Sequence, residues 1–245
     1  MIPKTIHYCW LSKDPIPEKM RRCMDSWKEK LQGYEFMLWN FDRFDINGSI
    51  WVKQAFEAKK YAFAADFIRL YAVYHHGGIY LDMDMEIVKP FDDLLDAEYF
   101  MGYESDFSRF IEAGCFGAEK HSPIIENCLN YYDNREFITS NGRYDTLILP
   151  RIMREACDKN VTGLHFYPHD YFTAKSFKTG KVNITGNTYC VHHFASGWLP
   201  PALSAAYKIR RKIFSLVGDG IVFKAVDFGD SLLAKVYRFL RRIKI

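Results

Sequence analysis

The chain has 245 residues, of which 49% are hydrophobic and 17% aromatic, and its formal net charge is +3. A chain of this kind can bury a large core and fits one substantial domain, which excludes a disordered or fibrous protein. Its six cysteines contain no C-x-x-C pair, so the sequence predicts neither a zinc site nor a disulfide framework and favours a reducing compartment.

The sequence predicts no secretory or membrane-spanning segment. The opening MIPKTIHYCWLSKDPIPEK lacks the charged leader, long apolar run and cleavage site of a signal peptide. No apolar run reaches the roughly 18 residues that a spanning helix needs. We therefore expect a cytoplasmic protein, with attachment to the inner membrane surface left open.

The first 40 residues predict the start of an α/β sheet. Residues 4–11 are predicted to form a buried strand, residues 17–31 an amphipathic helix and residues 34–40 a second strand. This order favours a mainly parallel sheet with binding groups at the strand ends. Further strands are predicted over residues 98–105 and 113–120, and a helix over residues 122–134.

One long helix is predicted over residues 49–76, ending at Gly77 and Gly78, where a left-handed conformation costs little. Its second half, YAFAADFIRLYAVY, is nearly all apolar and therefore buried. Asp66 and Arg69 are three residues apart there and share one face. They form either a structural ion pair, which the spacing alone favours, or part of a polar pocket.

Three acids follow the next predicted strand, in GGIYLDMDMEIVKPF. Asp82, Asp84 and Glu86 stand at alternate positions, so in an extended segment they would share one face. Carboxylates buried at the end of a core strand are costly unless a cation or solvent neutralises them. Two neighbouring oxygen donors suit Mg²⁺ or Mn²⁺. The alternative is a solvated loop with two unrelated acids, because a D-x-D pair alone is common.

The combined stretch AADFIRLYAVYHHGGIYLDMD resembles the signature of the DXD-containing glycosyltransferases of family 32, which include fungal Golgi mannosyltransferases and bacterial polysaccharide enzymes. It is also similar to the core of the bacterial glucosylating toxins. IPKTIHYCWLSKDPIPE and VHHFASGW resemble the family's opening and closing motifs, so the resemblance spans roughly residues 2–200. It implies a GT-A fold over residues 1–204.

The resemblance also implies a function. It predicts an enzyme that transfers a hexose from a nucleotide sugar, with a UDP-sugar favoured, to a saccharide acceptor with retention of the anomeric configuration. The expected cofactor is Mn²⁺ or Mg²⁺, because a metal ion neutralises the charge that develops on the diphosphate leaving group. The expected pathway is the synthesis of a surface polysaccharide such as capsule or lipopolysaccharide.

The same resemblance assigns roles to residues. Asp84 is expected to bind the metal directly, and Asp82 to contact sugar or ribose hydroxyls and reach the metal directly or through water. Asp66 and Arg69 would hold the transferred sugar. The expected catalytic residues are Asp66, Arg69, Asp82 and Asp84, and the expected nucleotide-sugar contacts are Trp10, Asp66, Arg69, Tyr80, Asp82, Ser196 and Trp198.

Some of these assignments keep alternatives. Trp10 is expected to stack on the nucleotide base, with a core tryptophan as the alternative. His193 is the expected third metal ligand, with adjacent His192 as the alternative, since sequence does not fix the register of a loop. Glu86 has no role in the family and is expected to be a surface or second-layer acid. Glu112 stands where many relatives have an asparagine or another polar residue, in a segment that usually shapes the acceptor side. The resemblance therefore does not indicate which acceptor the enzyme uses.

Charge divides the chain at about residue 204. Residues 205–245 carry ten Lys and Arg against three Asp, a net charge of +7, whereas residues 1–204 carry 23 against 27, a net charge of −4. Apolar residues recur at helical spacing in this tail. We expect basic amphipathic helices that lie on the inner membrane surface and bring the enzyme to a lipid-linked acceptor. The alternative is a basic helical cap that docks on the sheet.

Two other functions remain open at this level. A metal-dependent phosphoesterase or nucleotide-sugar hydrolase would also need clustered carboxylates, although two-metal hydrolases generally use more ligands than one D-x-D and one histidine. A non-catalytic module that binds a sugar nucleotide would share the fold. The presence of Asp66, Arg69, Asp82 and Asp84 together favours the enzyme.

Overall fold

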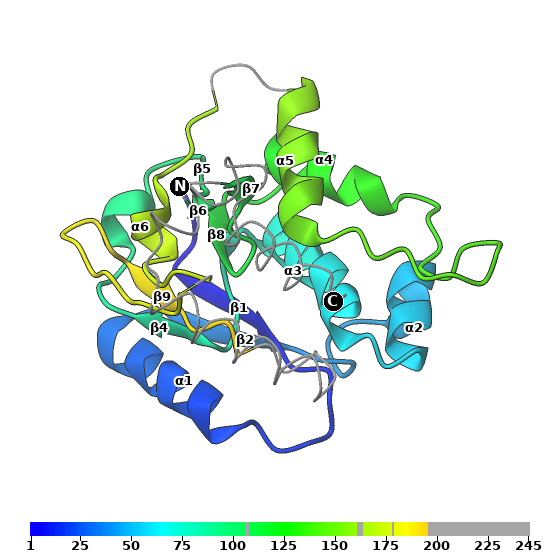
Figure 1. Cartoon of the computed structure of the whole chain (residues 1–245), viewed down its shortest axis with the longest axis horizontal. Helices are drawn as coiled ribbons and strands as arrows, with labels where there is room; N and C mark the ends of the chain where they lie inside the picture. The colour runs from blue at the N-terminus through cyan, green and yellow to red at the C-terminus, as the bar shows by residue number, and fades with distance from the viewer. Residues whose placement is uncertain (106–107, 161–163, 178, 196–245) are drawn as a thin grey trace, which may run out of the picture. The chain divides into compact units, whose positions relative to one another are not determined.

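The computed structural model describes residues 1–105, 108–160, 164–177 and 179–195 (Figure 1). Most of them form one compact unit, residues 1–174 and 184–193. In the small remainder, an isolated antiparallel bridge joins Lys175 and Val182. Among the described residues, no helix combines the length and the apolar character needed to cross a lipid bilayer.

The larger unit is built on a five-stranded sheet with the order β2-β1-β3-β8-β5. β1 (Thr5–Cys9) is parallel to β2 (Glu35–Trp39) and to β3 (Gly78–Leu81). β8 (Cys115–Ala118) is antiparallel to both β3 and β5 (Tyr99–Phe100), so β8 alone opposes the other four strands of this sheet. The predicted α/β class with a mainly parallel sheet is confirmed.

Helices cover both faces of this sheet. α1 (Glu18–Lys30) packs on the side of β4, and α2 (Ile50–Glu57) and α3 (Tyr61–His76) lie on the opposite side (Figure 1). Along β3, Leu81 joins the apolar core under α1, whereas Tyr80 joins the core under α3. β3 is therefore buried on both faces, as a central strand of an α/β sheet should be.

The remaining elements are two short antiparallel ribbons, three helices and three 3-10 turns among the described residues. β4 pairs with β9, and β6 pairs with β7, in two antiparallel ribbons. These elements are β4 (Met85–Ile87), β6 (Tyr103–Ser105), β7 (Ser108–Ile111), β9 (Cys190–His192), α4 (Pro123–Leu129), α5 (Leu149–Asn160), α6 (His169–Phe172), and the 3-10 turns η1 (Ile46–Gly48), η2 (Asp92–Leu94) and η3 (Asn130–Tyr132).

The single helix predicted over residues 49–76 is wrong, because the chain breaks it into α2 and α3. Lys59 adopts a left-handed backbone conformation, with φ of 57°, and the Lys60 amide donates to the Ala55 carbonyl. α2 then folds back on α3, where the Trp51 indole N–H donates to the Phe63 carbonyl at 2.9 Å. The break lets α2 pack on α3 and bury its Trp51, Val52 and Ala55 side chains.

The turn from α3 into β3 is held by glycines and by a buried histidine. Gly77 and Gly78 have φ of 66° and 110°, and a Cβ on Gly78 would lie 2.6 Å from the Thr5 carbonyl oxygen. His7 Nε2 lies 2.7 Å from the Gly77 carbonyl oxygen, and the Trp39 indole N–H donates to His7 Nδ1 at 3.1 Å. These partners require a neutral ring with its proton on Nε2.

This arrangement predicts a pH-dependent loss of stability. Burial lowers the pKa of His7 from 6.5 to about 4. The unfolded chain therefore binds a proton before the folded chain does, and the free energy of unfolding should fall as the pH drops from 6.5 towards 4. Between pH 7.5 and pH 5 we expect this residue to account for a loss of about 2 kcal/mol.

Urea unfolding of the parent and of His7→Gln at both pH values measures this contribution. The difference between their free energies of unfolding should shrink by that amount at pH 5, since glutamine does not titrate. A difference that is the same at both pH values would contradict the prediction.

Candidate functional site

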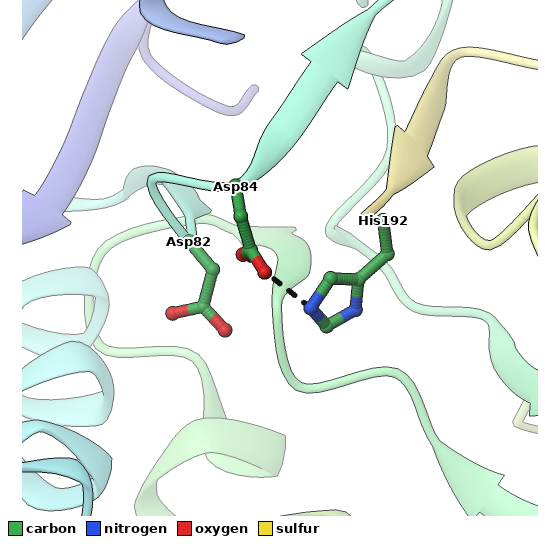
Figure 2. A group of neighbouring side chains, drawn as sticks. All are labelled: Asp82, Asp84 and His192. Atoms are coloured by element: carbon green, nitrogen blue, oxygen red, sulfur yellow. Dashed lines mark ion pairs between the residues drawn. The ribbon is translucent and has the colours of Figure 1, made fainter. Parts of the chain in front are cut away.

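Asp82 and Asp84 flank a turn that joins β3 to β4 at the carboxyl edge of the sheet. The Met85 amide donates to the Asp82 carbonyl at 3.0 Å, so this segment is a turn and the extended geometry predicted for it is wrong. Met83 is buried in the core under α1, and the turn brings the Asp82 and Asp84 side chains close together (Figure 2). Glu86 lies on β4 and is exposed, as expected.

A histidine completes this group. Asp82, Asp84 and His192 each offer a ligand atom, and the three atoms lie within 4.8 Å of one another. His192 comes from the end of β9, opposite Met85 of β4, and its Nε2 lies 3.5 Å from Asp84 Oδ1 (Figure 2). We name Asp82, Asp84 and His192 the acid-histidine cluster.

The structure brings His192 into this cluster, whereas the sequence analysis favoured His193. His192 is the last residue of β9 and His193 follows it, and the two rings point to different partners. The His193 ring turns instead to Glu86, with Nε2 2.7 Å from Glu86 Oε2. The His193 amide donates to the Asp84 carbonyl at 3.0 Å, which fixes the register of the two segments.

Behind His192 lies Glu112, which the sequence analysis did not place in the site. Glu112 is 2% exposed, and His192 Nδ1 lies 3.1 Å from both of its carboxylate oxygens. Burial alone would raise the pKa of Glu112, but His192 and the hydrogen bonds from Thr173 and Gly114 outweigh it and lower that pKa. Burial likewise opposes the charged His192 ring, yet Glu112 and Asp84 raise its pKa well above the usual value.

On the other side of the cluster, Arg69 bridges two acids. Arg69 Nη2 lies 3.3 Å from Asp66 Oδ1, and Nη1 lies 3.2 Å from Asp82 Oδ2. Nη1 also donates to the Ala113 carbonyl at 2.8 Å. The Tyr80 hydroxyl donates to Asp82 Oδ1 at 2.8 Å, so both carboxylate oxygens of Asp82 have a protein partner. The predicted residues Asp66, Arg69, Tyr80, Asp82 and Asp84 are thus neighbours in space.

The site carries more negative than positive charge. Burial first, and the Glu112 charge second, raise the pKa of Glu104 to about 7. Burial also raises the pKa of Asp66 to about 6, against the attraction of Arg69. Five acids of the site, Asp66, Asp82, Asp84, Glu104 and Glu112, face Arg69 and the His192 ring, and this ring must give up its Nε2 proton to ligate a metal. A divalent cation held by Asp84, His192 and Asp82 would balance this excess, and a mixed carboxylate and imidazole set can ligate a transition metal.

Two further predictions concern the nucleotide. Trp10 follows β1 and lies at the same sheet edge as Asp82, because β1 and β3 are parallel. Its ring is partly buried and its indole N–H donates to the Asp14 carbonyl at 3.0 Å, so the stacking role predicted for it stays a prediction. Ser196 and Trp198 lie outside the described residues.

Part of this site is similar to known glycosyltransferases. Residues 17–101 match the model of a glycosyltransferase sugar-binding region containing the DXD motif. Inositol phosphoceramide mannosyltransferase 1 of Schizosaccharomyces pombe is 29% identical over 164 residues, which are 60% of this chain and 48% of the relative. Uncharacterized glycosyltransferase L373 of Acanthamoeba polyphaga mimivirus is 30% identical over 139 residues, 51% of this chain and 53% of the relative. The chain spans about half the length of these curated relatives.

A solved structure supports the fold. PaToxG Glycosyltransferase superposes with a TM-score of 0.50 at 22% sequence identity, covering 64% of this chain and 68% of that chain. At this identity the likeness concerns the fold, and it confirms the predicted GT-A type. Asp66, Arg69, Tyr80, Asp82 and Asp84 all fall inside the matched residues. Residues 17–101 are therefore similar to the glycosyltransferase sugar-binding regions that contain a DXD motif.

Proposed function

We propose that the protein is a metal-dependent glycosyltransferase that moves a hexose from a nucleoside diphosphate sugar to a saccharide acceptor. The observation that carries this proposal is the acid-histidine cluster, because its three ligand atoms lie within 4.8 Å of one another at the carboxyl edge of an α/β sheet. Ligands bind at this edge in such sheets. Two of the cluster's members are the aspartates of the family motif.

Each residue has a role in this proposal. Asp84 and His192 would bind the ion, which neutralises charge that develops on the leaving diphosphate. Asp82 is held in place by hydrogen bonds from Tyr80 and Arg69. It would accept hydrogen bonds from sugar or ribose hydroxyls and supply a further ligand to the metal. We favour Mn²⁺ over Mg²⁺, because Mg²⁺ prefers oxygen ligands and His192 offers nitrogen.

Transfer would proceed with retention on one face of the sugar. The bond between the anomeric carbon and the diphosphate oxygen breaks, and the acceptor hydroxyl oxygen bonds to the same face. The hydroxyl proton passes to the departing phosphate oxygen. We propose a UDP-sugar as donor and a lipid-linked saccharide of a surface polysaccharide as acceptor. Support for the hexose class comes from the mannosyltransferase relative, and support for a lipid-linked acceptor comes from the basic tail.

Incubation with UDP- and GDP-sugars tests this function. We expect release of free nucleoside diphosphate with Mn²⁺, loss of release with EDTA and recovery on adding Mn²⁺ again. A phosphoesterase would release a sugar phosphate or inorganic phosphate, and a binding module would release nothing. Either of those outcomes would replace the proposed transferase by the corresponding alternative.

We also propose that the tail attaches the protein to the inner membrane surface, which would make it a peripheral protein on the cytoplasmic side. Residues 205–245 lie outside the described residues, so the support is their sequence alone. Leu232, Val236, Leu240 and Ile243 recur at helical spacing among basic residues. Each Lys or Arg near an anionic surface adds about 1 kcal/mol of attraction.

Flotation with anionic liposomes measures this attachment. The full chain should float with the vesicles at low salt and less so at high salt, because salt screens the attraction. Deletion of residues 206–245 should abolish flotation while donor hydrolysis persists. If the truncated chain floats equally well, or the full chain stays unbound at low salt, the tail is a packing element.

A further inference from the structure

Glu112 is a buried carboxylate that contacts one member of the candidate metal site, His192. Its Oε1 accepts from the Gly114 amide at 2.7 Å, and its Oε2 accepts from the Thr173 hydroxyl at 2.7 Å. Thr173 is itself 1% exposed. The remaining acceptor capacity of Glu112 faces His192 Nδ1, 3.1 Å from each oxygen. Its two other donors thus hold the carboxylate in place against one edge of the imidazole.

The backbone of the segment that carries Glu112 is hydrogen-bonded to Asp82 and to Gly102. The Asp82 amide donates to the Gly114 carbonyl at 2.8 Å, and the Glu112 amide donates to the Gly102 carbonyl at 2.8 Å. A Cβ on Gly114 would lie 2.8 Å from Glu112 Oε1 and 3.0 Å from Asp82 Oδ2. The lack of a side chain at residue 114 therefore lets both carboxylates approach this backbone.

We propose that Glu112 is the positioning residue that makes His192 a metal ligand, by holding its ring so that Nδ1–H donates to Glu112 and Nε2 faces Asp84. This inference rests on the metal-dependent function proposed above. A carboxylate accepts and never donates when ionised, so the proton it fixes must sit on Nδ1. That leaves the lone pair on Nε2, which lies 3.5 Å from Asp84 Oδ1. Carboxylates behind metal-binding histidines commonly act in this way.

A purely structural role makes a different prediction. A buried ion pair between Glu112 and His192 would stabilise the fold but would be indifferent to the metal. Glu112→Gln distinguishes the structural role from the positioning role. The backbone N–H of Gly114 can only donate, so it keeps the side-chain oxygen of the new glutamine as its acceptor. The amide NH₂ is then left to Thr173 and to His192 Nδ1. The variant thus removes the negative charge and one of the two acceptors 3.1 Å from Nδ1, and it sets an NH₂ donor in place of that acceptor. This favours a ring whose Nδ1 accepts and whose proton sits on Nε2, so the share of rings with a metal-binding lone pair on Nε2 falls.

Electron paramagnetic resonance of Mn²⁺ measures the effect directly. Titration of the full chain with Mn²⁺ alone gives the affinity, and echo modulation from a bound ¹⁴N reports coordination by His192. Glu112→Gln should weaken Mn²⁺ binding about 10- to 100-fold and reduce the ¹⁴N modulation. Thr173→Val, which removes one donor to Glu112, should change both in the same direction by less than tenfold. Glu126→Gln is the matched control. Glu126 is an exposed carboxylate on α4 that accepts a hydrogen bond from the Tyr74 hydroxyl at 2.7 Å, and this variant should bind Mn²⁺ with the affinity of the parent chain.

A double variant separates an indirect role from a direct one. If Glu112 acts through His192, adding Glu112→Gln to His192→Ala should weaken Mn²⁺ binding no further than His192→Ala alone. Unchanged affinity and modulation in Glu112→Gln would overturn the positioning role, and Thr173→Val decides the matter if Glu112→Gln does not fold. A parent chain that binds no Mn²⁺ would instead overturn the proposed metal site, and with it this inference.

Discussion

Asp84→Asn should lower the rate of transfer by about 10² to 10³, the effect typical of removing one electrostatic contact to a developing charge. Asp84 is 8% exposed and lies against His192, so the variant removes an anionic ligand and keeps the size of the side chain. The fold should persist, because the amide still fits the turn between β3 and β4. Donor turnover with saturating Mn²⁺, and a thermal melt of the same sample, measure the two effects.

Glu86→Gln is the matched control for this change. Glu86 lies two residues further along the chain, is exposed and contacts His193 outside the cluster. It should retain the parent's rate. Asp84→Asn turning over as fast as the parent would remove the metal assignment, and an equal loss in both variants would point to a general charge effect.

Asp66→Asn should reduce donor turnover about 10- to 100-fold while leaving the melting temperature unchanged or higher. The loss follows if the Asp66 carboxylate accepts a hydrogen bond from the donor sugar, since bonds to charged groups contribute about 1.5 to 3 kcal/mol. The stability result follows from the pKa of Asp66, which burial raises from 3.8 to about 6. Stability that this residue supplies below pH 3.8 is lost as the pH rises through 6, so at pH 7.5 the ionised carboxylate costs the fold about 3 kcal/mol.

The opposite result identifies a structural ion pair. If Asp66 served mainly to neutralise Arg69, Asp66→Asn would leave a buried guanidinium short of a partner and lower the melting temperature markedly. A large loss of stability, with full activity in the folded fraction, would contradict a role in donor binding. The measurement belongs at pH 7.5, because near pH 5 the effects of Asp66 and His7 on stability run in opposite directions.

The sequence predicts the elements whose formation depends on residues within the same short segment. β1, α1 and β2 follow from hydrophobic periodicity, and the end of α3 follows from Gly77 and Gly78. The break between α2 and α3 has no glycine or proline to mark it, and it depends on packing between the two helices. The sequence analysis contains no prediction for the helix α5, which begins at Leu149.

The site divides in the same way. Asp82 and Asp84 were predicted because two acids after a buried strand are unusual and match a motif. The choice of His192 over His193 depends on the pairing of β4 with β9, which sequence alone does not fix. Glu112 contacts a residue 80 positions away in the chain. The one local hint is an acid placed inside the apolar run FIEAGCF, where an ionised side chain needs a partner.

Anomalous diffraction from crystals grown with Mn²⁺ and UDP would test the central claim most directly. The account predicts one manganese peak bonded to Asp84 and to Nε2 of His192, with the diphosphate oxygens completing its coordination and Asp82 beside it. A manganese peak elsewhere, or a nucleotide bound with its diphosphate away from the acid-histidine cluster, would contradict the account.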